Sequence, residues 1–230
     1  MNWQLLPTLS APMLLQMACD EVLLESFKKQ SQTAVLRFYV SPEPWISVGC
    51  SFRNEDKIRK SDLVRKNSGV GICRRITGGG CVLHGEDLIF SLVVRYAGNP
   101  LEDILGTVKT SYAKIHEAVC LGFRECGLDP RFYRYGEDLP KGNDCFDFPV
   151  ESDLSWKGKK IAGGAQKRSE GVLLHHESIS IPKGVDREFL IRAMRHGMET
   201  VLGVTIVATD LVPEVFFEAE RRVKAVLSEN

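Results

Sequence analysis

Residues 74–84 carry the strongest chemical pattern in the sequence, because two arginines directly precede three glycines in the run RRITGGGCVLH. Glycine lets backbone N–H groups approach a ligand closely and adopts positive φ without steric cost. The arginine guanidinium is a rigid fork of donors that suits a carboxylate or a phosphate. The segment therefore indicates a loop that holds an anionic or strongly polar acyl compound against the main chain. The alternative is an ordinary glycine-rich turn between two strands, with both arginines solvated.

Cys145 is a candidate nucleophile. It lies in the turn-rich segment 142–149, GNDCFDFP, and loops on a rigid scaffold commonly hold reactive groups. A thiol there becomes nucleophilic when a nearby cation stabilises its thiolate. Taken alone, the same residue also fits an inert, partly buried cysteine between aromatic side chains.

Lys160 is a candidate for such a cation. It follows the two-residue turn Lys157-Gly158 and precedes Gly163 and Gly164, whose small size leaves the backbone open to a ligand. A lysine presented into a pocket stabilises a thiolate, polarises a carbonyl or pairs with a phosphate. The alternative for this segment is an ordinary solvated lysine.

His175 and His176 are adjacent in a strand-like segment, so strand alternation lets only one of them face a site. A metal site would need further convergent ligands, and the segment has neither an H-x-x-x-H nor an H-x-x-E-H spacing. We therefore expect no metal here, but a histidine that shapes a pocket or is satisfied in the core.

Amphipathic helices and short apolar strands must position these residues. Periodicity and turn residues predict helices over 13–29, 55–66, 107–126, 187–202 and 213–227. They predict strands over 34–40, 45–49, 71–75, 88–95, 154–156, 160–162, 172–174 and 178–181. Helices that bracket mostly sequential, hairpin-joined strands indicate an α/β (α+β) fold with one dominant mixed sheet.

The composition restricts the possible partners and the compartment. The 230 residues hold 30 Lys and Arg against 30 Asp and Glu, so a sequence-wide affinity for nucleic acid has no support. No apolar run approaches the ~20 residues of a membrane span, and the N-terminus lacks a secretory pattern. The seven cysteines include no C-x-x-C pair, which fits reduced cytoplasmic thiols rather than a disulfide framework. We expect one catalytic domain over residues 1–230, acting as a cytoplasmic monomer.

Several segments, taken in order, resemble the enzymes that attach lipoate or octanoate to proteins. Residues 74–84 resemble the family segment R-R-x-[ST]-G-G-G/R-x-V-x-H, and residues 160–166, KIAGGAQ, resemble K-[IV]-x-G-x-A-x. Residues 174–179, LHHESI, are similar to the strand x-x-H-G-[ST]-[ILV], and residues 17–21, MACDE, to the opening M-A-x-D-E. The chain departs from the pattern at Glu177, where family members usually have glycine, which puts the backbone approach expected there in question.

The resemblance implies a biotin/lipoyl protein ligase-type domain, in which a mixed, largely antiparallel sheet flanked by helices holds an acyl tunnel. It implies that the catalytic pair is Cys145 and Lys160, because one octanoyltransferase branch has Cys-Phe shortly before its lysine segment. The substrate-binding residues that it implies are Arg75, Thr77, Gly78, Gly79, Gly80, His84, Gly163, Ala165 and His176.

The resemblance also implies the reaction and its partners. An octanoyltransferase takes octanoate from acyl carrier protein as a cysteine thioester and passes it to a lysine of a lipoyl domain or of the glycine cleavage H protein. That reaction requires no cofactor. Three alternatives remain open: an ATP-dependent lipoate–protein ligase that would use ATP and Mg, an amidotransferase between carrier proteins, and a non-catalytic module that binds lipoyl domains.

Overall fold

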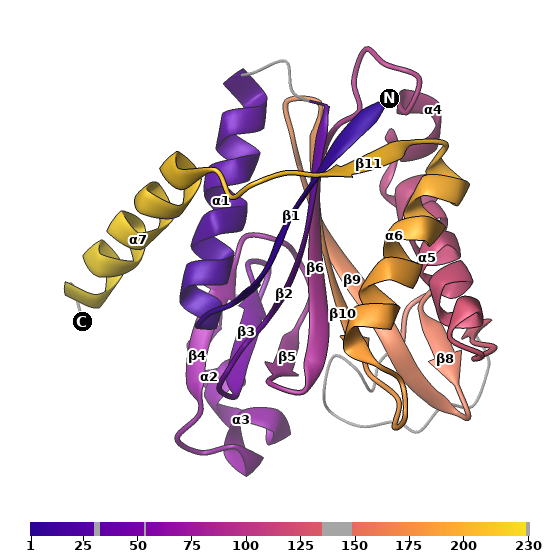
Figure 1. The fold of residues 1–230 in the computed structure, drawn as a ribbon. Coiled ribbons are helices and arrows are strands. Elements are labelled where there is room, and N and C mark those ends of the chain that lie inside the picture. The colour runs from indigo at the N-terminus through magenta and orange to yellow at the C-terminus, as the bar shows by residue number, and fades with distance from the viewer. Residues whose placement is uncertain (30–32, 53, 135–148, 229–230) are drawn as a thin grey trace.

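A computed structural model describes residues 1–29, 33–52, 54–134 and 149–228 (Figure 1). Its strands are β1 (Asn2–Ser10), β2 (Ala34–Val40), β3 (Trp45–Gly49), β4 (Gly71–Arg75), β5 (Cys81–His84), β6 (Asp87–Arg95), β7 (Arg131–Phe132), β8 (Leu154–Trp156), β9 (Lys159–Ser169), β10 (Val172–Ser180) and β11 (Thr205–Ala208). Its helices are α1 (Met13–Lys29), α2 (Glu55–Lys60), α3 (Asp62–Lys66), α4 (Glu102–Leu105), α5 (Val108–Glu125), α6 (Arg187–Leu202) and α7 (Pro213–Ser228).

A large mixed sheet forms the centre of the molecule, with strand order β11-β1-β2-β6-β10-β9-β8-β7. The strands β11, β1 and β2 run parallel to one another, whereas every pairing from β2 to β7 is antiparallel. Hairpin-type connections favour antiparallel neighbours because a short turn can only reverse the chain. The predicted fold class, a mixed and largely antiparallel sheet flanked by helices, is confirmed.

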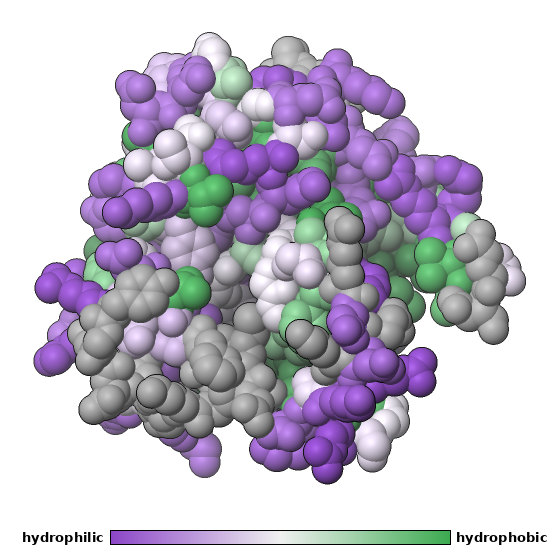
Figure 2. All heavy atoms as spheres, turned by 180° about the vertical axis from the view of Figure 1, so that it is seen from behind, coloured by the Kyte–Doolittle hydropathy of each residue, from purple (hydrophilic) through white to green (hydrophobic). Residues whose placement is uncertain are grey.

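Helices cover both faces of this sheet (Figure 1). The pair α5 and α6 packs on one face, while α1 lies on the other with α7 outside it. The largest apolar cluster fills the space under α5 and α6 and includes Phe90, Phe123 and Met194, all fully buried. Burying each side chain of this size contributes about 1.5–3 kcal/mol. Hydrophilic side chains dominate the face drawn in Figure 2, and hydrophobic ones gather there only in small patches.

A small second sheet, in the order β4-β3-β5, lies on the α1 side of the molecule. The glycine segment of the sequence connects β4 to β5, and β3 pairs with both of them. Its apolar residues Ile46 and Val48 are fully buried in a cluster of their own. The small sheet therefore presents the glycine loop beside the edge of the cavity described below.

The predicted bounds of several elements agree with the structure, and others require correction. The predicted helix 55–66 is two short helices, because Ser61 ends α2 and caps α3 through its side chain. The predicted strands 172–174 and 178–181 are one continuous strand, β10, and the predicted strand 160–162 is only part of the longer β9. Within the described residues, the helices are all too short or too polar to cross a bilayer.

Candidate active site

Arg75 holds the glycine loop in place. It is the last residue of β4, and its buried Nη1 donates to the carbonyl oxygen of Ser47 (3.0 Å) and to the Ser47 hydroxyl (2.9 Å). Its Nη2 donates to the carbonyl oxygens of Gly78 (2.9 Å) and Gly80 (3.0 Å). The planar fork of donors predicted to bind a ligand anion thus binds the loop itself, and a lysine cannot reproduce this geometry.

The loop packs directly against the end of β3. A Cβ atom at Gly49 would lie 2.2 Å from the carbonyl oxygen of Gly79, so only glycine permits this approach. Gly79 itself has φ +88°, a left-handed conformation in which L side chains are strained. The amide of Cys50 donates to the carbonyl oxygen of Thr77 at 2.9 Å. The backbone of the glycine loop is therefore held rigidly against the end of β3.

Lys160 is held by a buried carboxylate. Its Nζ lies 2.7 Å from Oδ2 of Asp153, whose side chain is fully buried. Lys157 and Gly158 both have positive φ (50° and 74°), as a tight hairpin turn requires, and this turn returns β9 beside β8. A Cβ atom at Gly163 would lie 2.1 Å from the Lys160 Cε, so glycine at this position makes room for the lysine.

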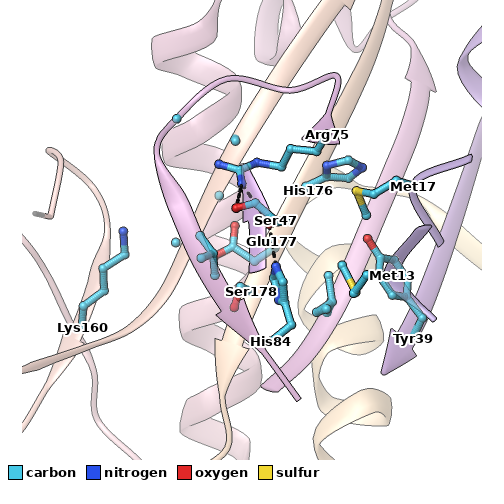
Figure 3. A pocket seen from close by; sticks show the side chains of 16 residues that line it. Met13, Met17, Tyr39, Ser47, Arg75, His84, Lys160, His176, Glu177 and Ser178 are labelled. Carbon is cyan, nitrogen blue, oxygen red and sulfur yellow. Dashed lines mark hydrogen bonds between the residues drawn. The ribbon is translucent and has the colours of Figure 1, made fainter. Parts of the chain in front are cut away.

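The glycine loop and Lys160 line one cavity. In Figure 3, Lys160 lies at one end of the view, and the apolar side chains of Met13 and Met17, with Tyr39, lie at the other. The cavity is thus amphipathic, with a cation near one end and an apolar surface at the other. A wider groove between α5 and β9 shares Gly79, Gly164 and Ala165 with the cavity.

His84 is fixed between two hydrogen-bond partners in the middle of this cavity (Figure 3). Its Nε2 lies 2.7 Å from the Ser47 hydroxyl, and its Nδ1 lies 2.7 Å from Oδ2 of Asp87. The Ser178 hydroxyl donates to the same Asp87 oxygen at 2.6 Å. Because Arg75 donates to the Ser47 hydroxyl, that hydroxyl is free to donate to Nε2, which leaves the proton of a neutral His84 on Nδ1.

His176 lines the cavity from β10 and contacts α1. Its Nδ1 lies 3.1 Å from the Thr77 hydroxyl, and its Nε2 lies 2.9 Å from Oδ2 of Asp20. Burial alone would raise the pKa of Asp20. The guanidinium of Arg37, which lies 2.6 Å from Oδ1, and the imidazole of His176 outweigh burial and lower that pKa to about 2. Asp20 therefore stays ionised, and it ties the predicted M-A-x-D-E helix to the cavity wall.

Glu177 is among the residues that line the cavity, but its carboxylate is held by His116 of α5. Strand alternation turns it and His175 toward α5, away from His176, as predicted for the two histidines. A Cβ atom at Gly164, directly opposite on β9, would lie 2.4 Å from Oε2 of Glu177. The carboxylate therefore occupies the space beside Gly164, which also lines the cavity.

The structure brings most of the predicted site residues together. Those that line the cavity are Arg75, Gly79, His84, Lys160, Gly163, Ala165 and His176. The other predicted loop residues contribute differently: Thr77 is buried behind His176, Gly78 lines the outer groove, and Gly80 accepts from Arg75. Cys145 lies outside the described residues.

Sequence reasoning missed three residues that position the site, Ser47, Asp87 and Asp153. Each contacts a predicted residue through a side chain, respectively Arg75, His84 and Lys160. One signal was available for Asp153, since it stands just before the predicted hairpin whose other arm carries Lys160.

Burial makes four of the thiols in the described part of the chain poorly suited to nucleophilic attack. Burial raises the pKa of Cys19 to about 11 and that of Cys73 to about 12, and it also raises the pKa of Cys120 and Cys126. Cys50 is exposed but does not line the cavity. In the same described residues, His, Cys, Asp and Glu form no group of three or more suited to a metal ion.

Residues 12–196 match the family described as the lipoyl protein ligase A/B catalytic domain. Among curated proteins, octanoyltransferase LipM of Bacillus subtilis (strain 168) is 35% identical over 195 residues, which cover 82% of this chain and 68% of that protein. Octanoyltransferase LipM of Moorella thermoacetica is 31% identical over 244 residues, covering 98% of this chain and 87% of that protein.

Solved structures show the same fold. A lipoate-protein ligase A bound with ATP superposes with a TM-score of 0.75 at 23% identity, covering 97% of this chain and 94% of that chain. Protein Ta0514 of T. acidophilum with bound lipoic acid superposes with a TM-score of 0.74 at 21% identity, covering 96% of this chain and 94% of that chain.

Proposed function

Because the chain belongs to the lipoyl protein ligase A/B catalytic domain family, we propose that it is an octanoyltransferase of protein lipoylation that works through a thioester at Cys145. The observation that carries the reaction type is the identity of 31–35% to octanoyltransferases over most of the chain. The amphipathic cavity supports it, because an acyl chain needs an apolar chamber and its reacting carbonyl needs polar surroundings.

The cavity suits a medium-length acyl chain. The methylenes lie against Met13 and Met17, and the carbonyl lies toward Lys160 and Gly79. Each buried methylene contributes about 0.8 kcal/mol, so a chain that fills the apolar end binds more tightly than a shorter one. The donor is octanoyl-acyl carrier protein, whose thioester enters through the groove along α5 and β9. The acceptor is a lysine of a lipoyl domain or of the glycine cleavage H protein, and the enzyme acts as a monomer.

The first half-reaction transfers octanoate to the enzyme. The Cys145 thiolate attacks the thioester carbonyl, its C–S bond forms, and the C–S bond to the carrier breaks. Backbone N–H groups of the glycine loop stabilise the oxyanion of the tetrahedral intermediate. The Lys160 ammonium, which Asp153 holds in place, gives its proton to the departing carrier thiolate.

The second half-reaction releases the product. The amine of the acceptor lysine attacks the Cys145 thioester, an amide bond forms, and the cysteine leaves as a thiolate. The proton lost by the attacking amine returns to Lys160, which restores the ammonium. No nucleotide is required, because the donor thioester already carries an adequate leaving group.

Mass spectrometry of the intact enzyme tests this proposal. After mixing with octanoyl-acyl carrier protein, we expect one octanoyl adduct on Cys145, absent in Cys145→Ala and retained in Cys50→Ala, which removes an exposed thiol. The Cys145→Ala variant should also lose transfer to an acceptor domain. Full transfer by this variant would refute the thioester route. Formation of lipoyl-adenylate with lipoate, ATP and Mg, without any octanoyl adduct, would instead identify a ligase.

A further inference from the structure

A buried group of charged and polar side chains lies on the α5 face of β10, and the proposed mechanism does not use it directly. Its members are His116 of α5 and His175 and Glu177 of β10, each at most 1% exposed. Burying ionisable groups is costly unless each has a partner. Their hydrogen bonds show what this group holds in place.

His116 is an imidazolium on geometric grounds. Its Nδ1 lies 2.6 Å from the carbonyl oxygen of Ser152, and its Nε2 lies 3.0 Å from both carboxylate oxygens of Glu177. Carbonyl and carboxylate oxygens only accept, so both ring nitrogens must donate. Burial would lower the pKa of His116, but the Glu177 carboxylate outweighs it and raises that pKa. Burial alone would raise the pKa of Glu177, but the positive charge of His116 outweighs burial and lowers that pKa to about 2.

The carbonyl that His116 binds belongs to a strained turn next to the reactive lysine. Ser152 has φ +77°, a left-handed conformation that is unfavourable for a residue with a side chain. The next residue, Asp153, accepts from the amide of Val150 at 2.7 Å and pairs with Lys160 at 2.7 Å. His116 therefore fixes the backbone that aims the Asp153 carboxylate at Lys160.

Glu177 also acts through a second route. It lies opposite Gly164, and the space that a side chain at Gly164 would need is filled by its carboxylate. The Gly164 amide donates to the Tyr112 hydroxyl at 3.0 Å, and that hydroxyl donates to Oδ1 of Asp153 at 2.5 Å. His175 holds the Glu177 carboxylate from the other side, with Nε2 2.8 Å from Oε2. Both routes end at Asp153.

We propose that Glu177 and His116 form a buried ion pair that positions Asp153, and through it the Lys160 ammonium, for acyl transfer. This assignment rests on the proposed function only for the role of Lys160. It gives a reason for a carboxylate at a position where glycine is the usual residue of the family pattern. Glu177 and His116 are positioning residues, because the Glu177 carboxylate is held by His116 and His175, and His116 does not line the cavity.

Two variants test the ion pair of Glu177 and His116, and each is matched by a control substitution of the same residue type at an exposed position. Glu177→Gln and His116→Gln remove one partner each. Glu117→Gln changes an exposed residue adjacent to His116 whose only ion-pair partner given by the structure is Lys114, and His196→Gln changes an exposed histidine paired with Glu125. We expect kcat for octanoyl transfer to fall about tenfold to a hundredfold in the first two variants. The KM for the donor and the activity of both controls should stay near wild type.

A second readout does not depend on acyl transfer. Brief acetylation with acetic anhydride, followed by peptide mass spectrometry, gives the reactivity of Lys160 relative to its exposed neighbour Lys159. We expect this ratio to rise severalfold in Glu177→Gln, because the ammonium loses its fixed carboxylate partner. Gly164→Ala tests the same arrangement while every charge is kept. The added Cβ would lie 2.4 Å from Oε2 of Glu177 and would displace the carboxylate. This variant should raise the ratio as well.

The outcomes separate the two proposals. A Lys160 ratio and a kcat that both match wild type in folded Glu177→Gln and Gly164→Ala would overturn the positioning role. A wild-type enzyme without octanoyl transfer would refute the proposed function, and the acetylation ratio would still decide the positioning of Lys160. A rise in KM with unchanged kcat would also contradict positioning, because it would indicate a role in binding the donor.

Discussion

Gly163→Ala should disable Lys160 while leaving the fold intact. The added Cβ would lie 2.1 Å from Cε and 2.4 Å from Nζ of Lys160. To reach an ordinary carbon–carbon contact of about 3.5 Å, Cε must move by roughly 1.4 Å. Such a movement stretches the 2.7 Å contact between Lys160 and Asp153 to the limit of an ion pair. The atoms that must move are the far end of a flexible side chain, so the midpoint of thermal unfolding should change little.

The loss of activity follows from the size of this movement. A misplacement of about 1 Å costs on the order of 10²-fold in rate, which corresponds to about 2.7 kcal/mol of activation free energy. We therefore expect single-turnover octanoyl transfer to slow by about a hundredfold in Gly163→Ala. The measurement is the rate of octanoyl transfer from the carrier to an acceptor domain, with the unfolding midpoint recorded in parallel.

A double-mutant cycle tests the physical reasoning. In Lys160→Ala the two atoms closest to the new Cβ are absent and only Oδ1 of Asp153, at 3.2 Å, remains near it, so adding Gly163→Ala should reduce the rate little further. If Gly163→Ala slows the reaction equally in the Lys160→Ala background, the glycine acts on the substrate or the backbone, and the explanation through Lys160 is refuted.

Two further substitutions address the loop and the α1 contact. Arg75→Lys removes a fork that donates to Gly78 and Gly80, so we expect a loss of about 2 kcal/mol in the free energy of unfolding together with slower transfer, measured by urea denaturation and the same rate assay. Equal stability would contradict the role of Arg75 in holding the loop. The pKa of Asp20 lies at about 2 instead of 3.8, so its ionised form contributes roughly 2 kcal/mol of stability that is present above pH 4 and lost as the pH falls toward 2. Asp20→Asn should therefore lower the free energy of unfolding at pH 7 and flatten the decline of that free energy between pH 4 and 2, as measured by denaturation at a series of pH values. An unchanged decline would show that Arg37 and His176 do not stabilise the ionised form of Asp20.

The sequence predicted elements best where apolar periodicity is regular. The bounds expected for 13–29, 34–40, 45–49, 71–75 and 187–202 agree with α1, β2, β3, β4 and α6. β1 was missed because Pro7 interrupts its pattern, and the structure accommodates that proline where the register with β2 shifts between Leu6 and Leu9. The prediction was also wrong for 55–66, where a Ser61 cap divides one apparent amphipathic run into two helices.

The break predicted within β10 shows why polar residues mislead such patterns. His175 and Glu177 interrupt the apolar run of the sequence, yet both are buried within one continuous strand, because His116 from α5 satisfies the carboxylate. Their partner stands some 60 residues away, and no local pattern reveals it. The motif residues Arg75, Lys160 and His176 were predictable as a set, whereas the partners that orient them depend on tertiary contacts.

The two faces of β10 connect these observations. Alternation places His176 on the cavity side, against Thr77 and Asp20, and places Glu177 on the α5 side, against His116. One strand therefore supports the proposed acyl chamber from one face and carries the Glu177–His116 pair, to which we assign the positioning of Lys160, on the other. A one-residue slip of β10 would exchange the two faces and destroy both arrangements at once. The continuous antiparallel register of β10 with β6 and β9 prevents that slip, which is why a strand that carries adjacent buried histidines and a glutamate can form part of the active site.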